Sequence, residues 1–437
     1  MPTMAQELDL MEKIVSLAKR RGFVFPGSEI YGGLASTFDY GPMGVELKNN
    51  LKRLWWKYFV QDREDMTGLD GGIILSPKIW EASGHVQNFK DPLVECKKCR
   101  RRFRADAVEG ACPECGGAFG DVRQFNMMFK TPVGATGDEN SISYLRPETA
   151  GGIFVNFKNV VDSLHPKLPF GIAQIGKAFR NEIAPRDFIF RSREFEQMEI
   201  EYFVRPGEWE ASFEAWRQSI HAFNDAVGIA RGNVHEMEVA DGERAHYSKR
   251  TIDFEFDFPF GRKELYGLAY RTDFDLKAHA GASSVDLSYL DDSQENQGNR
   301  FIPHVIEPSF GVDRTVLAVL ASAYTEDGLG GEVRTYLKLN PAVAPIKAAV
   351  FPLLKNKPEL VARAREVYAM LKKNTPQIMW DDNGNIGKRY RRQDEIGTPA
   401  CITIDFQTLE DGTVTLRDRD TGAQERVHAN DLLSRIS

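Results

Sequence analysis

The stretch FRNEIAPRDFIFRSREFEQMEIEYF, residues 179–203, has the pattern of two strands joined by a loop, and it mixes arginine, glutamate and phenylalanine. Alternate residues of a strand point to opposite faces of a sheet. One face of this hairpin is therefore apolar and suited to packing, with Ile175, Phe179, Met198, Ile200 and Tyr202. The other face combines charges with an aromatic ring, and its members are Gln174, Arg180, Glu182, Phe195, Gln197, Glu199 and Glu201.

The mixed face suits a ligand that offers a phosphate to arginine, a flat ring to phenylalanine and an amino group to the carboxylates. A nucleotide bound next to an amine meets all three requirements. The alternative is a solvated sheet face with cross-strand salt bridges, but this alternative does not explain an aromatic side chain among the charges.

Two further segments have a strand–turn–helix pattern with polar groups at the turn. In VIEPSFGVDRTVLAVL a strand ends near Glu307, Gly311 makes the turn, and a helix opens with Arg314 in its first turn. An arginine at such a junction can lie over a purine face or reach a terminal phosphate. The segment YLRPETAGGIFVNF leaves Glu148 at a similar turn.

The chain has 437 residues, 42% of them hydrophobic and 27% charged, which predicts a globular protein of two or three domains. No apolar run approaches the ~20 residues of a membrane-spanning helix, and the N-terminus lacks the features of a secretory signal. A cytoplasmic protein without a membrane partner is therefore expected. The formal net charge of −7 means that nucleic acid binding requires a local basic patch.

Strand-like runs joined by hairpins, with helices in blocks, predict an α+β fold. A composition shift at NPAVAPIKAAVFPL divides the chain into a large domain, 1–344, and a smaller α/β domain, 345–437, with the order strand, helix, strand, helix, strand. The helical pattern at 45–59 carries an apolar stripe, which we expect either in the core or at a dimer interface.

Four of the five cysteines form two CxxC pairs in an insert at 92–123, namely Cys96 with Cys99 and Cys112 with Cys115. Two such knuckles supply a tetrahedral thiolate cage for zinc, and four thiolates leave no open position for a substrate. We therefore predict a structural zinc site. Cys401 lies in a strand and is expected to be a buried apolar residue.

Together these segments resemble the class II aminoacyl-tRNA synthetases. FRNE…REFEQMEIE is similar to their second signature motif, EPSFGVDR to the third, and GGIILSP with Pro77 to the first, which forms the dimer interface in that class. SEIYGG, FDYGPMGVELKNNL, LRPETA, GIFVNFKNV, YRTDFDL and DNGNIGKRYRRQDEIGTP resemble the homodimeric glycine-specific family, from about residue 20 to 430. The resemblance implies an antiparallel sheet flanked by helices, a zinc-ribbon-like insert and a C-terminal anticodon-binding domain.

The resemblance implies an ATP site that uses Mg²⁺. Arg180 would hold the α-phosphate, Glu182 would read the adenine amino group, and Phe195 would stack on the ring. Arg314 would cover the other face of the adenine or bind the γ-phosphate, and Glu264 would bind Mg²⁺. The catalytic candidates are Arg180, Glu264 and Arg314. The implied ATP-binding set is Arg180, Asn181, Glu182, Phe190, Arg191, Phe195, Glu264, Leu265, Gly311, Asp313 and Arg314.

It also implies a glycine site. Glycine offers no side chain to grip, so selection depends on charge around its ammonium and on a pocket too small for a methyl group. The implied residues are Arg104, Glu148, Phe195, Gln197, Glu199, Glu307 and Ser309. The chain departs from the family after Arg104, where it reads RADAVEG instead of RADHLL and lacks a helical insertion found in some relatives.

The implied activity has two steps. Glycine and ATP form glycyl-adenylate and pyrophosphate, and the glycyl group then passes to the 3′-terminal adenosine of tRNA(Gly), with a homodimer as the working unit. The implied tRNA contacts are the basic residues of the last domain, Lys388, Arg389, Arg391 and Arg392.

Two alternatives remain open. One is a synthetase-like nucleic-acid-binding protein without catalysis, which has no need of the intact set Arg180, Glu182, Phe195, Glu264 and Arg314. The other is a class II ligase for serine, threonine or proline, which requires a group that reads the side chain or ring. Glu148 together with EPSFG favours glycine over these.

Overall fold

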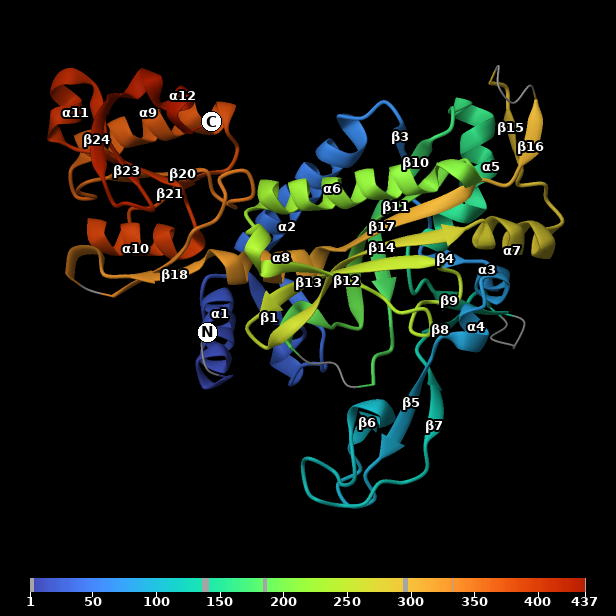
Figure 1. Ribbon diagram of the computed structural model, residues 1–437. Helices are drawn as coiled ribbons and strands as arrows, with labels where there is room; N and C mark the ends of the chain where they lie inside the picture. The colour runs from blue at the N-terminus through green and yellow to red at the C-terminus, as the bar shows by residue number, and fades with distance from the viewer. Residues whose placement is uncertain (1–3, 136–140, 184–186, 294–297, 332, 437) are drawn as a thin grey trace.

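The computed structural model describes residues 4–135, 141–183, 187–293, 298–331 and 333–436 (Figure 1). Its largest sheet has seven strands in the order β12, β13, β14, β17, β11, β10, β3. Neighbouring strands are antiparallel except β10 and β3, which are parallel. The predicted α+β fold is confirmed. The strands are β3 (Met66–Gly68), β10 (Phe170–Phe179), β11 (Glu194–Val204), β12 (Val234–Glu238), β13 (Arg250–Phe258), β14 (Gly261–Thr272) and β17 (His304–Gly311).

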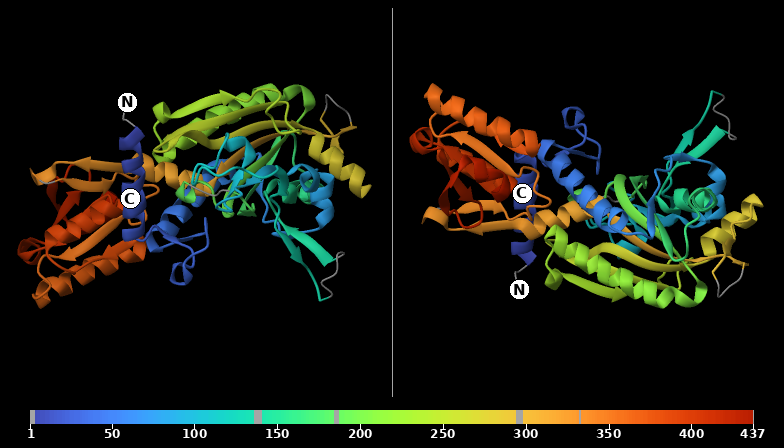
Figure 2. Two further views of the ribbon diagram at one scale, coloured as in Figure 1. Left: turned by 90° about the horizontal axis from the view of Figure 1, so that it is seen from below. Right: turned by 90° about the horizontal axis from the view of Figure 1, so that it is seen from above.

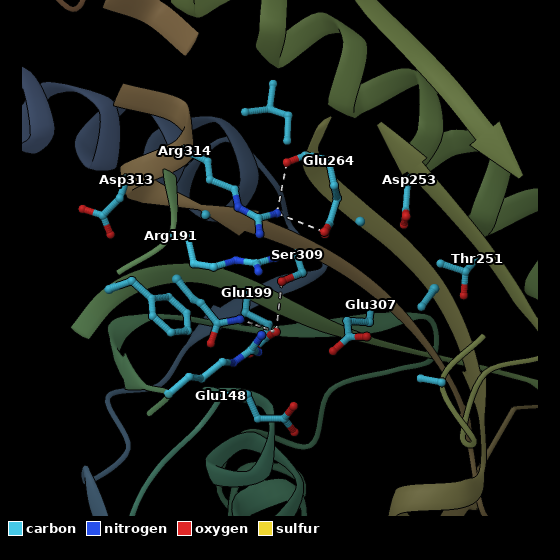
Figure 3. A pocket seen from close by; sticks show the side chains of 18 of the residues that line it. Glu148, Arg191, Glu199, Thr251, Asp253, Glu264, Glu307, Ser309, Asp313 and Arg314 are labelled. Carbon is cyan, nitrogen blue, oxygen red and sulfur yellow. Dashed lines mark hydrogen bonds and ion pairs between the residues drawn. The ribbon is translucent and has the colours of Figure 1, made fainter. Parts of the chain in front are cut away.

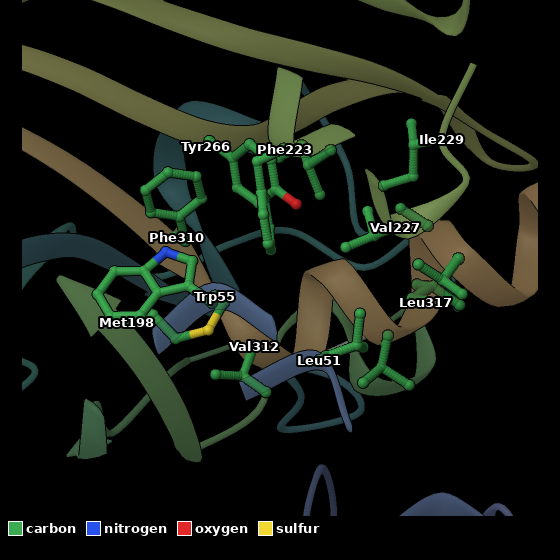
Figure 4. Close-up of a cluster of buried hydrophobic side chains, with 14 of the residues drawn as sticks. Leu51, Trp55, Met198, Phe223, Val227, Ile229, Tyr266, Phe310, Val312 and Leu317 are labelled. Carbon is green, nitrogen blue, oxygen red and sulfur yellow. The ribbon is translucent and has the colours of Figure 1, made fainter. Parts of the chain in front are cut away.

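Helices cover both faces of this sheet (Figures 1 and 2). Helices α2, α6 and α8 pack on one face around the main hydrophobic core, to which Trp55, Phe223 and Phe310 belong (Figure 4). Helices α5 and α7 pack on the other face, where Phe157 and Phe203 join a second core. These helices are α2 (Pro42–Trp56), α5 (Ala150–Leu164), α6 (Trp209–Val227), α7 (Phe274–Ser283) and α8 (Val312–Ala323).

The hairpin β10–β11 has the two faces predicted for it. Gln174 opposes Glu199 and Ala178 opposes Phe195 across the pair. The residues that point into the main core are Met198, Ile200 and Tyr202, all of them buried. The polar residues of β11 therefore face the side of the sheet that α5 and α7 cover only in part.

The first strand of the hairpin is shorter than predicted. It ends at Phe179, which is half-buried, so Arg180 and Glu182 lie beyond the strand. Beyond Phe179, the backbone N–H of Arg180 still donates to the carbonyl of Arg193, and that of Asn181 donates to the carbonyl of Met127, from another segment. Arg180 and Glu182 are thus presented by a loop anchored to its neighbours.

The apolar stripe predicted at 45–59 belongs to the core of this chain. Leu47, Leu51, Trp55 and Phe59 are each fully buried, and the helix continues beyond α2 as a π-helical turn, Lys57–Gln61. Val45 alone of the predicted stripe is exposed, at 40%. The stripe is therefore used for packing within the chain.

The cysteine-bearing insert is a three-stranded sheet that projects away from the body of the protein (Figure 1). Its central strand β5 (Lys90–Glu95) pairs with β6 (Arg102–Arg104) and β7 (Arg123–Asn126). The insert predicted at 92–123 thus corresponds to a hairpin-like arm whose tip carries the CxxC pairs.

The C-terminal part forms a separate five-stranded sheet in the order β21, β20, β22, β23, β24. Helices α9 and α12 pack on one face and α10 on the other. The predicted order of strands and helices is found, and two antiparallel strands that were not predicted extend the sheet. The elements are β20 (Ala348–Pro352), α9 (Pro358–Asn374), β21 (Ile378–Trp380), α10 (Ile386–Ile396), β22 (Ala400–Ile404), α11 (Phe406–Asp411), β23 (Thr413–Asp418), β24 (Gln424–His428) and α12 (Leu432–Ile436).

None of the described helices is long and apolar enough to cross a membrane. The N-terminal helix and several short elements complete the chain. They are α1 (Met4–Arg20), β1 (Val24–Pro26), β2 (Phe38–Tyr40), β4 (Ile74–Leu75), α3 (Pro77–Ala82), α4 (His85–Asn88), β8 (Lys130–Pro132), β9 (Ile142–Leu145), β15 (Tyr289–Asp291), β16 (Asn299–Phe301), β18 (Tyr324–Asp327) and β19 (Arg334–Leu337).

Candidate active site

A cavity of about 460 Å³ lies on the polar face of the large sheet (Figure 3). Its volume is in the range of small-molecule sites. All candidate ATP and glycine residues except Asn181 line it, although they come from five separate segments of the chain. They are Arg104, Glu148, Arg180, Glu182, Phe190, Arg191, Phe195, Gln197, Glu199, Glu264, Leu265, Glu307, Ser309, Gly311, Asp313 and Arg314.

One end of the cavity combines cations with aromatic rings. The guanidinium of Arg180 lies 5.2 Å from the ring centre of Phe195 and 5.3 Å from that of Phe89, and its Nε donates to the carbonyl of Pro147. The guanidinium of Arg314 lies 4.5 Å from the ring centre of Phe190. These arginines are held over aromatic faces, where a flat base or a phosphate can reach them.

Glu264 pairs with Arg314, and Asp253 lies near enough to Glu264 for their charges to interact. The charge of Arg314 lowers the pKa of Glu264, whose Oε2 is 3.0 Å from Arg314. Burial, and after it the charge of Glu264, raise the pKa of Asp253 to about 7. Asp253, which lies on β13 next to β14, was not predicted from the sequence. Paired carboxylates of this kind favour a divalent cation.

The other end of the cavity is rich in carboxylates. Glu199 accepts hydrogen bonds from Ser309 at 3.1 Å (Figure 3), from Gln197 at 3.3 Å and from Thr149. Burial and the charge of Glu148 raise the pKa of Glu199. Such a group favours a bound cation or proton.

Glu148 and Glu307 are each held by a basic side chain. Nε2 of His85 is 3.2 Å from Glu148, and His85 and Arg271 lower the pKa of Glu148 although burial opposes them. Arg271 donates to Glu307 at 2.5 Å, yet burial raises the pKa of Glu307 to about 8. Arg271 also forms a bidentate pair with Asp275 at 2.8 and 2.9 Å.

Carboxylates outnumber cations at this end, and a small cationic ligand would reduce their mutual repulsion. Sequence reasoning missed Arg271, Asp275 and Thr149. Arg271 and Asp275 belong to the quoted segment YRTDFDL, so their i, i+4 spacing at a strand–helix junction was a usable signal.

Three other candidates have mainly structural partners. Arg104 reaches the cavity from the insert and pairs with Asp91 at 3.0 Å and Asp106 at 2.7 Å. Asp313 accepts a hydrogen bond from the backbone N–H of Glu196 at 2.8 Å and another from a tyrosine hydroxyl. Asn181 lies outside the cavity lining and is anchored through its backbone, as described above.

The four cysteines of the insert converge as predicted. The Sγ atoms of Cys96 and Cys115 are 3.5 Å apart, those of Cys99 and Cys112 are 3.7 Å apart, and all four lie within 4.8 Å of one another. A Zn–S bond of ~2.3 Å gives a tetrahedron with edges of about 3.8 Å. The thiol positions therefore fit a zinc ion.

The basic cluster of the last domain is less exposed than predicted. Lys388 is exposed, but Arg389 is buried and donates to the carbonyls of Pro352, Asp382 and Gly384. Arg389 is therefore a structural residue and not part of a surface cluster.

The two remaining arginines are half-buried. Arg391 donates to the carbonyl of Val333, and Arg392 pairs with Asp381 at 2.8 Å.

The fifth cysteine, Cys401, is fully buried in β22, as expected.

Comparison with known proteins agrees with this architecture. Residues 129–323 match the tRNA synthetase class II core domain (G, H, P, S and T), and residues 347–437 match the anticodon binding domain. The chain is 51% identical over 462 residues to "Glycine--tRNA ligase" of Clostridium tetani, covering 98% of both chains. It is 51% identical over 451 residues to the protein of that name from Thermobifida fusca, covering 97% and 96%. A Geobacillus kaustophilus protein of that name is 52% identical over 453 residues, covering 97% of both. The chain belongs to the glycine–tRNA ligase family of class II aminoacyl-tRNA synthetases.

Proposed function

We propose that the protein is a glycine–tRNA ligase that forms glycyl-adenylate from glycine and ATP and then glycylates tRNA(Gly). One observation carries this proposal: a single cavity joins a cationic, aromatic end to an end with surplus carboxylates. The first end matches a nucleoside triphosphate and the second matches an ammonium group. Adenylate formation requires ATP and an amino acid to bind side by side in this way.

In the first step the glycine carboxylate attacks the α-phosphorus of ATP, and the bond to the leaving pyrophosphate breaks. Arg180 is proposed to hold the α-phosphate, and Phe195 to stack on the adenine ring once ATP displaces the guanidinium above it. Arg314 is proposed to bind the terminal phosphates or cover the base. Preorganised cations screen the repulsion between two anions without solvent reorganisation.

Mg²⁺ is the proposed metal cofactor, and the paired carboxylates of Glu264 and Asp253 are the groups that fit it. When bound, it would neutralise charge that develops on the phosphates. Zinc is proposed to be structural, since the four thiolates of the insert complete its coordination.

Glycine is proposed to bind with its ammonium among Glu148, Glu199, Glu307 and the hydroxyl of Ser309. Charge then supplies affinity, and the packed wall of the pocket supplies discrimination. A missing methylene changes binding by only ~1–3 kcal/mol, whereas exclusion of a larger side chain has no such ceiling.

The C-terminal domain is proposed to bind the tRNA anticodon, with Lys388, Arg391 and Arg392 near phosphates.

We also propose a homodimer. The strongly exposed apolar residues Ile30 and Tyr31, at 89% and 87%, lie in a 3₁₀ turn, Glu29–Tyr31, between β1 and β2. Later in the same connection the carbonyl of Ala35 accepts a hydrogen bond from Arg193, near the cavity. A solution mass of one chain at micromolar concentration would contradict the dimer.

The test is ATP–pyrophosphate exchange with each amino acid in turn, without tRNA. Exchange with glycine alone is expected. Equal exchange with alanine or serine would contradict the specificity, and no exchange with any amino acid would favour a non-catalytic binding protein.

A further inference from the structure

Glu201 is a site-facing residue to which the proposed function gives no task. Its side chain is fully buried, and neither of its carboxylate oxygens has a hydrogen-bond partner in the described part of the chain. It lies on β11 two residues after Glu199. Carboxylate oxygens of Glu199, Glu201 and Glu307 lie within 4.8 Å of one another.

Glu201 stands behind the wall of the cavity. Glu199 and Glu307 line the cavity, whereas Glu201 is not among the lining residues. A ligand in the cavity therefore touches the first two carboxylates and not the third. Any influence of Glu201 on the ligand passes through Glu199 and Glu307.

The groups around Glu201 leave it without a cation of its own. The charge of Arg271 on β14 acts on Glu201, but its guanidinium is already committed to Asp275 and Glu307. Helix α7 also brings His279, which is buried and whose pKa burial lowers, so it supplies no compensating charge at neutral pH. An ionised carboxylate in such a place is very costly, so the group keeps its proton instead.

We propose that Glu201 is a positioning residue, which in the ligand-free protein is a neutral carboxylic acid and donates a hydrogen bond to the carboxylate of Glu199 or Glu307. This inference rests on the proposed function, because it assumes that Glu199 and Glu307 bind the glycine ammonium. The shared proton lets three carboxylates stay close together and keeps the two that line the cavity in place for the glycine ammonium.

The electrostatics of the cluster agree with this assignment. Burial and the charge of Glu307 raise the pKa of Glu201 well above its ordinary value, and burial raises that of Glu307 to about 8. The proton belongs to the coupled group and not to one residue.

An ammonium bound at Glu199 and Glu307 weakens the hold of this group on its proton. Ligand binding therefore releases part of a proton near pH 8, and affinity for the ammonium rises as pH increases toward that value.

The test compares Glu201→Gln with Glu201→Leu. The amide of glutamine still donates to its neighbours, so we expect a glycine KM within threefold of wild type. Leucine fills the same space without a donor, so we expect the glycine KM to rise tenfold or more with kcat little changed. Asn224→Leu is the matched control. The side chain of Asn224 is also fully buried and without a hydrogen-bond partner among the described residues, but it lies on α6, which packs on the opposite face of the sheet from the cavity.

A second measurement detects the proton itself. Glycyl-sulfamoyl-adenosine is titrated calorimetrically at pH 8 in two buffers of different ionisation enthalpy. Wild type and Asn224→Leu are expected to release more protons on binding than Glu201→Gln, since the amide of glutamine does not ionise. The ammonium of the ligand contributes equally in every case.

Three results would overturn the inference: a tenfold rise in glycine KM for Glu201→Gln, an unchanged KM for folded Glu201→Leu, or equal proton release with and without Glu201. If Glu201→Leu does not fold, the Gln variant decides alone. A wild-type protein with no glycine-dependent exchange would instead contradict the proposed function.

Discussion

The carboxylate of Glu264 lies 3.0 Å from the guanidinium of Arg314, and the same guanidinium donates to the backbone carbonyl of Glu264 (Figure 3). This pair ties β14 to the first turn of α8. Each partner neutralises the other, so a triphosphate with its metal ion can separate them without leaving either charge unpaired. In the proposed function the metal would bind the carboxylate and a phosphate would bind the guanidinium.

Glu264→Gln keeps the size of the side chain but removes the charge that is proposed to attract Mg²⁺. We expect pyrophosphate exchange to fall by about 10²–10³-fold, the range for loss of one preorganised electrostatic group. Exchange assayed across a Mg²⁺ titration checks this. Asp257→Asn on the neighbouring strand β13 makes the same charge change outside the cavity and should leave the rate unchanged. Equal effects of the two variants would contradict the assignment.

Arg180→Ala removes the guanidinium that lies over Phe195. Adenylate formation should fall by at least about 10²-fold, because the α-phosphate would lose its stabilising cation in the transition state. Circular dichroism and thermal unfolding should resemble wild type, since among the described residues its side chain donates a single hydrogen bond, to the carbonyl of Pro147. The control is Arg262→Ala, a surface arginine. Retained exchange in Arg180→Ala would show that another group holds the phosphate.

The residues around the cavity differ in how far the sequence could predict them. Glu199 was predictable because the period of two along β11 fixes which side chains share a face. Asp253 was not, since its approach to Glu264 depends on the pairing of β13 with β14 and on a bulge next to Glu255. Strand order and bulges depend on tertiary packing, which a single-strand pattern does not contain.

The burial of Arg389 is a different case. Ile386, Arg389, Gln393 and Ile396 are spaced by three or four residues, which is the spacing of one helix face, and the last three are buried. Charge density suggested a surface cluster, whereas the period indicated that Arg389 faces the sheet. The periodicity, weighed against composition, would have given the correct placement.

Asp253→Asn should stabilise the ligand-free protein at pH 8. The folded-state pKa of Asp253 is raised to about 7, so between about pH 4 and 7 the folded state holds a proton that the unfolded state has lost. The free energy of unfolding of the wild-type protein therefore falls as pH rises through this window, and the asparagine variant does not share this loss. Because the side chain is partly exposed, we expect a gain of only about 1 kcal/mol for the asparagine variant.

Urea unfolding at pH 5 and pH 8, without Mg²⁺, measures this difference. The gain should shrink at pH 5 and in the presence of Mg²⁺ with ATP, because the metal then uses the aspartate charge. A stability loss at pH 8 would show that the ionised carboxylate is stabilised in the free protein.

The four-cysteine cage predicts about one zinc ion per chain. Cys112→Ser should lose most of the metal and the hydrogen-exchange protection of residues 90–126, while the seven-stranded sheet keeps its protection. Mass spectrometry of metal content and of exchange checks both points. Cys401→Ala removes a buried thiol elsewhere, so its zinc content should equal wild type. Wild-type protein purified in zinc without bound metal would contradict the site.

Lys388 and Arg389 are adjacent in the sequence but should respond oppositely to alanine substitution. Arg389 satisfies the carbonyls of Pro352, Asp382 and Gly384, so Arg389→Ala leaves buried acceptors without a donor and should lower the free energy of unfolding by at least about 2 kcal/mol. Lys388→Ala changes an exposed side chain and should leave stability within about 0.5 kcal/mol of wild type.

For tRNA binding we expect the opposite ranking: Lys388→Ala should have the larger effect and Arg389→Ala the smaller. If Lys388 contacts a phosphate, its removal should reduce the slope of log affinity against log salt by about one, between 50 and 200 mM salt. Arg389→Ala, measured well below its unfolding midpoint, should keep the wild-type slope, because a buried guanidinium releases no counterion. A salt slope that depends on Arg389 and not on Lys388 would mean that α10 turns its sheet-facing side toward the RNA.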